Sequence, residues 1–129
     1  MRTFKTKRLD RWARKEGLAD KVLWEAAEEV ANGNVEASLG QCLFKKRIAR
    51  PDGGKRSGFR TIVAFKNSSS DNVFFVYGFA KSGKSNITCV ELDVLGTVAK
   101  HYMEASNAEL EILIKNGSLF EVEEVHGNE

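Results

Sequence analysis

The spacing of apolar residues predicts two short helices at the start of the chain. Leu9, Trp12 and Ala13 recur at helical spacing, and Gly17 follows them as a typical helix stop. Asp20 is placed to cap a second helix. Its apolar positions share one face: Val22, Leu23, Ala26, Ala27 and Val30. An Asn-Gly-Asn run after these positions predicts the end of the second helix.

The pattern then changes to that of β-strands. Residues 42–49, 59–66 and 73–80 are apolar or alternating runs rich in Phe, Val and Ile, and turn-forming segments separate them. The separator at 67–72 has the composition of a hairpin loop, and the one at 51–58 is longer. We therefore expect an antiparallel meander of three strands.

After this meander the helical period returns. Thr88 with Glu91 fits a capping box, and so does Ser106 with Glu109 at the start of a shorter helix that stops at Asn116-Gly117. In the first of these helices we expect one shared apolar face: Ile87, Val90, Val94, Val98 and Tyr102. The order of helices, strands and helices predicts the α+β class.

The length and composition are those of one globular domain. The chain has 129 residues, of which 42% are hydrophobic and 29% charged, enough to bury a single core. We expect one domain over residues 1–129, with a C-terminal helical extension at about 87–120. No apolar run approaches the roughly 20 residues that cross a bilayer, and the residues after Met1 include no apolar stretch of the kind expected in a signal peptide. We therefore expect a cytoplasmic protein with no membrane partner.

Few residues are available for metal or redox chemistry. Cys42 and Cys89 are expected to be buried thiols of a reducing compartment. His101 and His126 lie far from both cysteines in sequence, so the pattern predicts no metal site.

Charge is distributed very unevenly along the chain. The net charge of +2 hides a stretch from 42 to 87 with ten Lys or Arg against two acids, followed by 42 residues with nine acids against two bases. A strongly basic stretch on strand-like sequence is typical of a protein that binds a polyanion. With no His, Cys or carboxylate cluster in that stretch, this pattern indicates RNA.

The predicted hairpins bring these cations together. Lys45 and Arg47 fall on one face of the first long strand because strand side chains alternate. The two hairpins gather a larger group at one end of the sheet: Arg47, Arg50, Lys55, Arg56, Arg60, Lys81 and Lys84. A phosphodiester backbone would offset their mutual repulsion. The alternative is that they are ordinary solvated side chains, or paired with the acidic C-terminal helices.

Several segments resemble a known family. The runs LFKKRI at 43–48, SGFRT at 57–61 and FVYGFAK at 75–81, with KTKRL at 5–9 and WAR at 12–14, resemble the RelE/ParE superfamily of toxins. The likeness is greatest to its RelE-like and HigB-like branch from bacterial type II toxin–antitoxin pairs, and it spans about residues 4–120. It implies a βααβββ core, in which a small antiparallel sheet carries two N-terminal helices.

The resemblance also implies a function. Such toxins cut translated messenger RNA inside the ribosome without a metal or other cofactor, and this endoribonuclease activity inhibits translation. Carried over by position, the implied catalytic residues are Lys45, Arg47, Arg60 and Lys81, with RNA contacts from Lys46, Arg50, Lys55, Arg56 and Lys84. The implied partners are the ribosome, its mRNA and a cognate antitoxin with a helix-turn-helix DNA-binding domain.

The chemistry of such a site needs no histidine. RNA supplies its own 2′-hydroxyl nucleophile, arginines can hold the phosphate in bidentate fashion, and a lysine among like charges can exchange a proton. We assign Arg60 and Arg47 to the phosphate and leave Lys45 and Lys81 open as base or acid. RelE-type members use a tyrosine where this chain has Ile87, so the acid–base assignment stays open. Phe79 or Tyr77 could stack on a base. We expect both to share one strand face with Val73 and Phe75, which favours a core role.

One motif argues for a different activity. Residues 78–85, GFAKSGKS, match the phosphate-binding P-loop pattern. A P-loop domain needs a parallel sheet with crossover helices, whereas these strands are predicted to be antiparallel, so we expect no nucleotide cofactor. Two further functions remain as alternatives, a ParE-like inhibitor of a topoisomerase and a non-catalytic RNA-binding homologue of the toxins.

Overall fold

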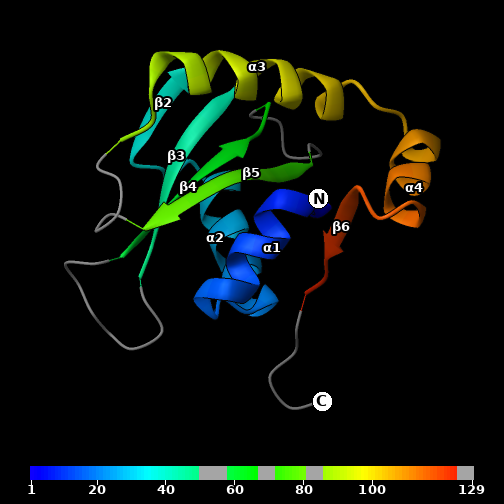
Figure 1. The fold of residues 1–129 in the computed structure, drawn as a ribbon, viewed down its shortest axis with the longest axis horizontal. Coiled ribbons are helices and arrows are strands. Elements are labelled where there is room, and N and C mark those ends of the chain that lie inside the picture. The colour runs from blue at the N-terminus through cyan, green and yellow to red at the C-terminus, as the bar shows by residue number, and fades with distance from the viewer. Residues whose placement is uncertain (50–57, 67–71, 81–85, 125–129) are drawn as a thin grey trace.

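A computed structural model describes residues 1–49, 58–66, 72–80 and 86–124 of the chain. In chain order, its elements are β1 (Thr3–Thr6), α1 (Lys7–Glu16), α2 (Asp20–Ala31), β2 (Ala37–Gly40), β3 (Leu43–Ile48), β4 (Phe59–Ala64), β5 (Val73–Ala80), α3 (Cys89–Met103), α4 (Asn107–Lys115) and β6 (Leu119–Val122). This arrangement confirms the α+β class, and Figure 1 shows the order of the elements.

The strands form one sheet in the order β2-β3-β4-β5-β1-β6. The predicted meander of β3, β4 and β5 is confirmed, with both pairings antiparallel. The other three strands were not predicted from the residue pattern. β2 pairs with β3, β6 pairs antiparallel with β1, and β1 lies parallel to β5. The C-terminal part of the chain is therefore not wholly helical, because β6 returns it to the sheet.

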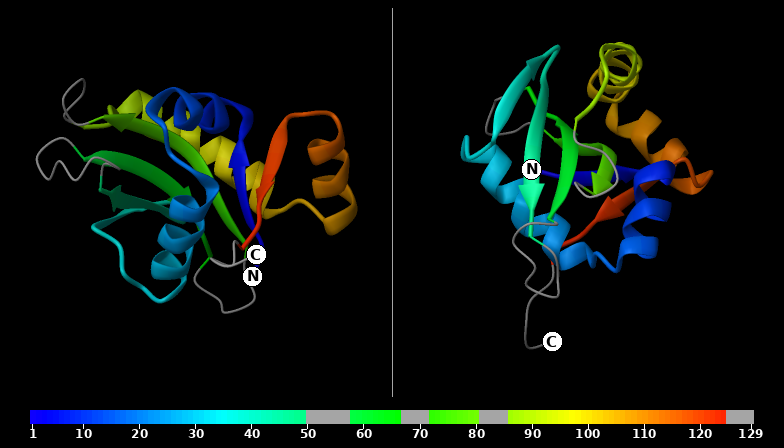
Figure 2. Two further views of the ribbon diagram at one scale, coloured as in Figure 1. Left: turned by 90° about the horizontal axis from the view of Figure 1, so that it is seen from below. Right: turned by 60° about the vertical axis from the view of Figure 1, so that its left-hand side comes forward.

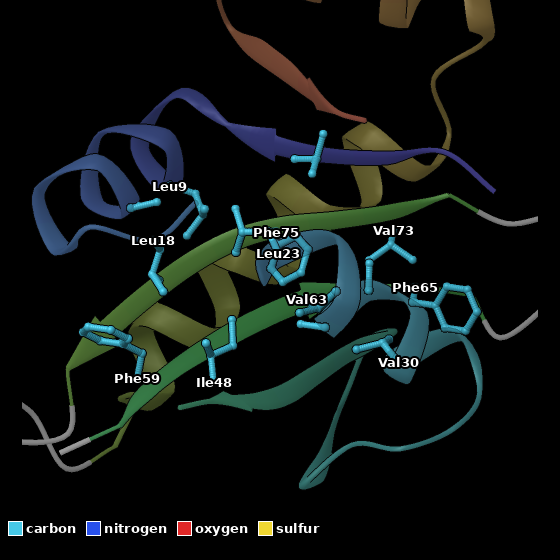
Figure 3. Close-up of a cluster of buried hydrophobic side chains, with 14 residues drawn as sticks. Leu9, Leu18, Leu23, Val30, Ile48, Phe59, Val63, Phe65, Val73 and Phe75 are labelled. Carbon is cyan, nitrogen blue, oxygen red and sulfur yellow. The ribbon is translucent and has the colours of Figure 1, made fainter. Parts of the chain in front are cut away.

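Helices cover both faces of the sheet (Figures 1 and 2). One face packs on α1 and α2 through a core that includes Leu9, Leu23 and Phe75, part of which is drawn in Figure 3. The other face packs on α3 and α4 through a second core that includes Phe4 and Leu110. The expectation of two N-terminal helices against the sheet is therefore confirmed, and α3 and α4 add a layer on the opposite face.

Local signals set most of the helix ends. Gly17 has a φ of 75°, a left-handed conformation that glycine adopts at low cost, and it ends α1 as predicted. Both predicted capping boxes, Thr88 with Glu91 and Ser106 with Glu109, are present. The predicted cap of α2 was wrong. Ala19 precedes that helix without a side-chain cap, and Asp20 lies in its first turn.

A β-bulge at Val76 changes which side chains share a face of β5. The register passes from Val63 opposite Phe75 to Ile62 opposite Tyr77, which leaves Val76 as the extra residue. Tyr77 therefore packs with the core under α3, whereas Phe75 packs with the core under α1 and α2. The expectation that Tyr77 shares a face with Phe75 was wrong for this reason.

The apolar face of α3 also differs from the predicted one. The residues buried against the sheet are Leu95, Gly96 and Ala99. Val90 and Val94, which the spacing placed on the shared apolar face, are 74% and 58% exposed. The helix has apolar residues on more than one side, so the periodicity alone could not identify the side that meets the sheet.

The two cysteines are on the surface. Cys42 lies at the turn between β2 and β3, Cys89 begins α3, and both are exposed free thiols. The expectation of buried thiols was therefore wrong. Among the described helices, none is both long and apolar enough to cross a membrane.

Candidate nucleic-acid interface

Three of the predicted catalytic residues lie on the same sheet face. Lys45 and Arg47 follow Leu43 at alternate positions of β3, and Leu43 belongs to the core under α3. Arg60 of β4 precedes Ile62 at the same spacing, and Ile62 belongs to the same core. In the β3–β4 register Arg47 is directly opposite Arg60. The sheet therefore sets two guanidinium groups side by side, with the Lys45 ammonium beside them on the same strand.

The Arg60 side chain is partly buried, and not all of its hydrogen-bond donors have partners among the described residues. Its Nη1 atom is buried and has no hydrogen-bond partner among the described residues. Burial lowers the pKa of Arg60 from its ordinary value, repulsion from Arg47 lowers it further, and attraction to Glu36 partly offsets both. A desolvated cation beside a like charge gains free energy when an anion binds. This position therefore favours an anionic ligand.

Glu36 is a carboxylate at this site that the sequence reasoning missed. It lies just before β2, and its Oε1 atom accepts a hydrogen bond from the backbone N–H of Arg47. No pattern identified it, because β2 itself was not predicted. The carboxylate is bound to backbone, and among the described residues no salt bridge joins it to Lys45, Arg47 or Arg60.

Lys45 contacts the segment that leads into α3. Its Nζ atom donates to Asn86 Oδ1 at 3.1 Å, and the same oxygen accepts the backbone N–H of Ile87 at 2.9 Å. Ile87, where the resemblance implied a tyrosine, is partly buried and packs against the core under α3. It therefore serves packing here, and its neighbour Asn86 supplies the polar contact.

Lys46 lies on the opposite face of the sheet from Lys45. It is only 4% exposed, and its Nζ atom is 3.1 Å from Glu29 Oε1 and donates to the Asn34 carbonyl at 3.0 Å. The strand alternation that brings Lys45 and Arg47 together turns Lys46 away from them. The structure therefore does not support the predicted RNA contact at Lys46, because its charge is already used inside the protein.

The remaining predicted cations belong to segments that the structure leaves undescribed. They are Arg50, Lys55, Arg56, Lys81 and Lys84. The described ends of these segments lie at the same end of the sheet, because Phe59 pairs with both Ile48 and Ala80. The roles given to these five residues stay predictions.

Two aromatic residues of β5 lie beside β4 on the sheet face that carries Lys45, Arg47 and Arg60. Phe79 is opposite Arg60 and is only 5% exposed. Tyr77 is opposite Ile62, its hydroxyl donates to Glu91 Oε2 at 3.0 Å, and the Arg8 guanidinium lies 5.4 Å from the centre of its ring. Both rings are engaged in packing, which agrees with the core role that the sequence favoured over base stacking.

The first glycine of the P-loop pattern has a structural reason. A Cβ atom on Gly78 would lie 2.4 Å from the Trp12 ring, so this position needs glycine to let α1 pack on β5. The strand that carries it is antiparallel to β4, as predicted, although it is parallel to β1. Packing therefore explains Gly78, residues 81–85 of the pattern lie outside the described residues, and the absence of a nucleotide cofactor stays a prediction.

Two hollows in the surface lie beside Arg47. One of about 640 Å³ lies between α2 and the end of β3, where Glu25, Glu28 and Glu29 share its wall with Arg47, and another of about 570 Å³ adjoins Arg47 and Glu36. The acidic wall of the larger hollow disfavours RNA there. In the described ranges, no three His, Cys, Asp or Glu side chains lie close enough to hold a metal ion. The prediction of a metal-free site is left untested by this observation.

Comparison with known proteins identifies the family. A search among curated protein sequences found no match. A family model described as the RelE toxin of the RelE/RelB toxin–antitoxin system matches residues 1–122, nearly the whole chain. This match agrees with the fold and with the resemblance of the strand segments. The chain therefore belongs to the RelE family of toxins.

Proposed function

We propose that this toxin is an endoribonuclease that cuts translated messenger RNA on the ribosome without a metal ion. As a RelE toxin it is one member of a toxin–antitoxin pair, and toxins of this family are generally endoribonucleases. The observation that carries the proposal is the cross-strand pair of Arg47 and Arg60. The Nη1 atom of Arg60 is buried and has no hydrogen-bond partner in the described ranges. A phosphate between the two guanidinium groups would supply that partner.

In the proposed reaction the RNA supplies the nucleophile. The 2′-oxygen attacks the adjacent phosphorus, the bond from phosphorus to the 5′-oxygen breaks, and a 2′,3′-cyclic phosphate and a free 5′-hydroxyl result. One group must accept the 2′-hydroxyl proton and another must give a proton to the departing oxygen. The additional negative charge on the phosphate in the transition state is what Arg47 and Arg60 would stabilise.

Lys45 and Lys81 are the candidates for the two proton transfers. The place of Lys45 on the same strand face as Arg47 supports this role, and its ammonium donates to a neutral amide oxygen of Asn86. Among the described residues no carboxylate forms a salt bridge with Lys45. Which lysine acts as base and which as acid is left open in this proposal.

The test is to map transcript ends by primer extension after induction in growing cells. We expect wild type to produce breaks within translated messages. We expect Arg60→Ala to reduce cleavage by about 100-fold or more, the usual loss when one donor to a developing oxyanion is removed. Arg11→Ala changes an exposed arginine of α1 and is the matched control, which should cleave as wild type does.

Three outcomes would contradict the proposal. Intact messages with a DNA-damage response would indicate a topoisomerase inhibitor of the ParE kind. Normal growth, with Arg60→Ala changing only RNA affinity, would indicate a binding protein without chemistry. Equal cleavage by wild type and Arg60→Ala would remove the arginine pair from the site.

A further inference from the structure

A groove runs along α3 on the side that faces the start of α1. Two adjoining hollows of about 280 and 200 Å³ form it, and they share Arg8, Val94 and Leu95 in their walls. One hollow extends to Val98 and Tyr102, and the other to Tyr77 and Val90. The groove thus follows α3 for about 12 Å between positions 90 and 98, at 1.5 Å of rise per residue.

The α3 wall of this groove is apolar and open to solvent. Val90, Val94 and Val98 follow one another at intervals of four residues, with Val90 74% and Val94 58% exposed. Among the described residues, Val90 and Val94 are two of the four large hydrophobic side chains that are strongly exposed, and they are one turn apart on α3, whereas Val98 is half-buried. A contiguous exposed apolar stripe of this kind is typical of a surface that a partner covers.

The opposite wall is basic. Lys7 and Arg8, in the first turn of α1, are both exposed and line the groove. The acid that lines it is Glu91, whose carboxylate already accepts hydrogen bonds from the Tyr77 hydroxyl and the Thr88 backbone N–H. The groove therefore offers an apolar strip on one side and, on the other, two cations that form no salt bridge among the described residues.

We propose that this groove is a docking site for an acidic amphipathic helix of the cognate antitoxin. Membership of the RelE family implies that such a partner exists. A helix places apolar residues at i, i+3 and i+4, which fit against the valine ridge of α3, and its flanking Glu or Asp residues would meet Lys7 and Arg8. The groove is distinct from the site of Lys45, Arg47 and Arg60 that is proposed for RNA.

Two other occupants fit less well. RNA presents a phosphate backbone, and a wall of exposed aliphatic side chains gives it nothing to bind. A second copy of this chain would have to bring an acidic helix. Beside the valine stripe of its α3 are Glu91, whose carboxylate is already hydrogen-bonded to Tyr77 and Thr88, and Asp93, a single further acid to set against Lys7 and Arg8. Charge complementarity therefore favours a separate acidic partner.

The probe is the full-length antitoxin, defined as the neighbouring gene product whose co-expression restores growth. Its affinity for the intact toxin is measured by titration calorimetry. We expect Val94→Glu and Arg8→Glu each to weaken binding by about 30-fold or more, the range of a buried hot spot. Both side chains are exposed in the free protein, so the fold should tolerate the changes.

Matched controls use the same substitutions away from the groove. Ile112→Glu changes a 62% exposed aliphatic side chain of α4, and Lys21→Glu reverses an exposed charge on α2. Both should bind within about twofold of wild type. Hydrogen exchange gives a second readout that needs no variant, and we expect the bound antitoxin to protect amides at 90–98 in α3.

The proposal is overturned if Val94→Glu binds the antitoxin as wild type does, or if no neighbouring gene product binds the toxin. It is also overturned if Val94→Glu instead weakens RNA binding or dissociates a dimer of the toxin. The measurement does not involve cleavage, so a chain that binds its antitoxin through this groove but leaves messages intact would contradict only the proposed ribonuclease function.

Discussion

The two faces of the sheet differ in whether their cations form salt bridges with carboxylates. On the face under α1 and α2, Lys5 is 7% exposed, and its Nζ atom lies 2.8 Å from Asp10 Oδ1 and 2.6 Å from Asp20 Oδ1. Lys46 on the same face is paired with Glu29. On the face under α3, Arg47 and Arg60 are opposite each other, and in the described part of the chain no carboxylate forms a salt bridge with either.

This difference separates cations that the fold pairs with carboxylates from cations that have no carboxylate salt bridge among the described residues. Burial of a charge is tolerated when a carboxylate is folded in with it, and α1 and α2 bring such carboxylates to Lys5. Burial would lower the pKa of Lys5, but the contacts with Asp10 and Asp20 outweigh it and raise the pKa above its ordinary value. Arg60 shows the opposite direction, because its lowered pKa reflects burial and a like charge.

The largest effect is expected on the paired face, from Lys5→Met. The variant keeps an unbranched apolar stem but leaves the Asp10 carboxylate, only 6% exposed, without its buried cation. Removing one partner of a buried ion pair typically costs about 3–5 kcal/mol, and we expect the free energy of unfolding to fall by that amount. Urea denaturation followed by circular dichroism measures it.

Lys21→Met is the control for this variant, because Lys21 is exposed on α2 and should change stability by less than about 0.5 kcal/mol. If Lys5→Met lost no more stability than the control, the salt bridges of Lys5 with Asp10 and Asp20 would contribute nothing measurable to the free energy of unfolding. The paired cations would then not differ from the unpaired ones in their effect on stability.

The paired face could be predicted only in part. Gly17, which ends α1, is a local signal and was identified from sequence. β1 was implied only by the family resemblance and not by the residue pattern, because its four buried residues include Thr3, Lys5 and Thr6, and its strand partners lie about 70 and 117 residues away in sequence. Asp20 was interpreted as a helix cap, whereas it binds Lys5, a contact that only the tertiary fold creates.

An intermediate effect is expected from Asp10→Asn, and it should depend on pH. Burial would raise the pKa of Asp10, but the Lys5 ammonium, aided by Arg14, lowers it below its ordinary value. A carboxyl with a lowered folded-state pKa stabilises the protein above its unfolded pKa of about 3.9, and the stabilisation is lost as pH falls through the folded-state pKa. At neutral pH we expect Asp10→Asn to cost about 1–3 kcal/mol.

Urea titrations from neutral to acid pH test this dependence. The stability gap between wild type and Asp10→Asn should be full near neutrality and close in acid. The carboxyl of Glu121, whose pKa is also lowered through its hydrogen bonds with Arg2, acts equally in both proteins, so the difference curve isolates Asp10. A gap that is constant with pH would mean that the Asp10 charge does not stabilise the fold.

The unpaired face could be predicted better than its surroundings. Alternation along β3 and hairpin pairing were enough to bring Lys45, Arg47 and Arg60 together, because both depend on short-range pattern. The same reasoning failed at Tyr77, since a bulge at Val76 shifts the alternation and no residue signal announces it. It also gave no sign of Glu36, whose place beside Arg47 depends on an unpredicted strand.

The smallest change in stability, and the sharpest contrast with Lys5, is expected from Arg60→Ala. The substitution breaks no ion pair of the described structure, removes a partly desolvated guanidinium and relieves its repulsion with Arg47. Against this stands the loss of packing by its aliphatic stem. We expect a net change within about 0.5 kcal/mol, measured by urea denaturation beside Lys5→Met. A loss above about 2 kcal/mol would make Arg60 a structural cation like Lys5 and would leave its buried, unpartnered nitrogen without a functional meaning, whereas an unchanged fold combined with lost cleavage would place its contribution in the bound phosphate alone.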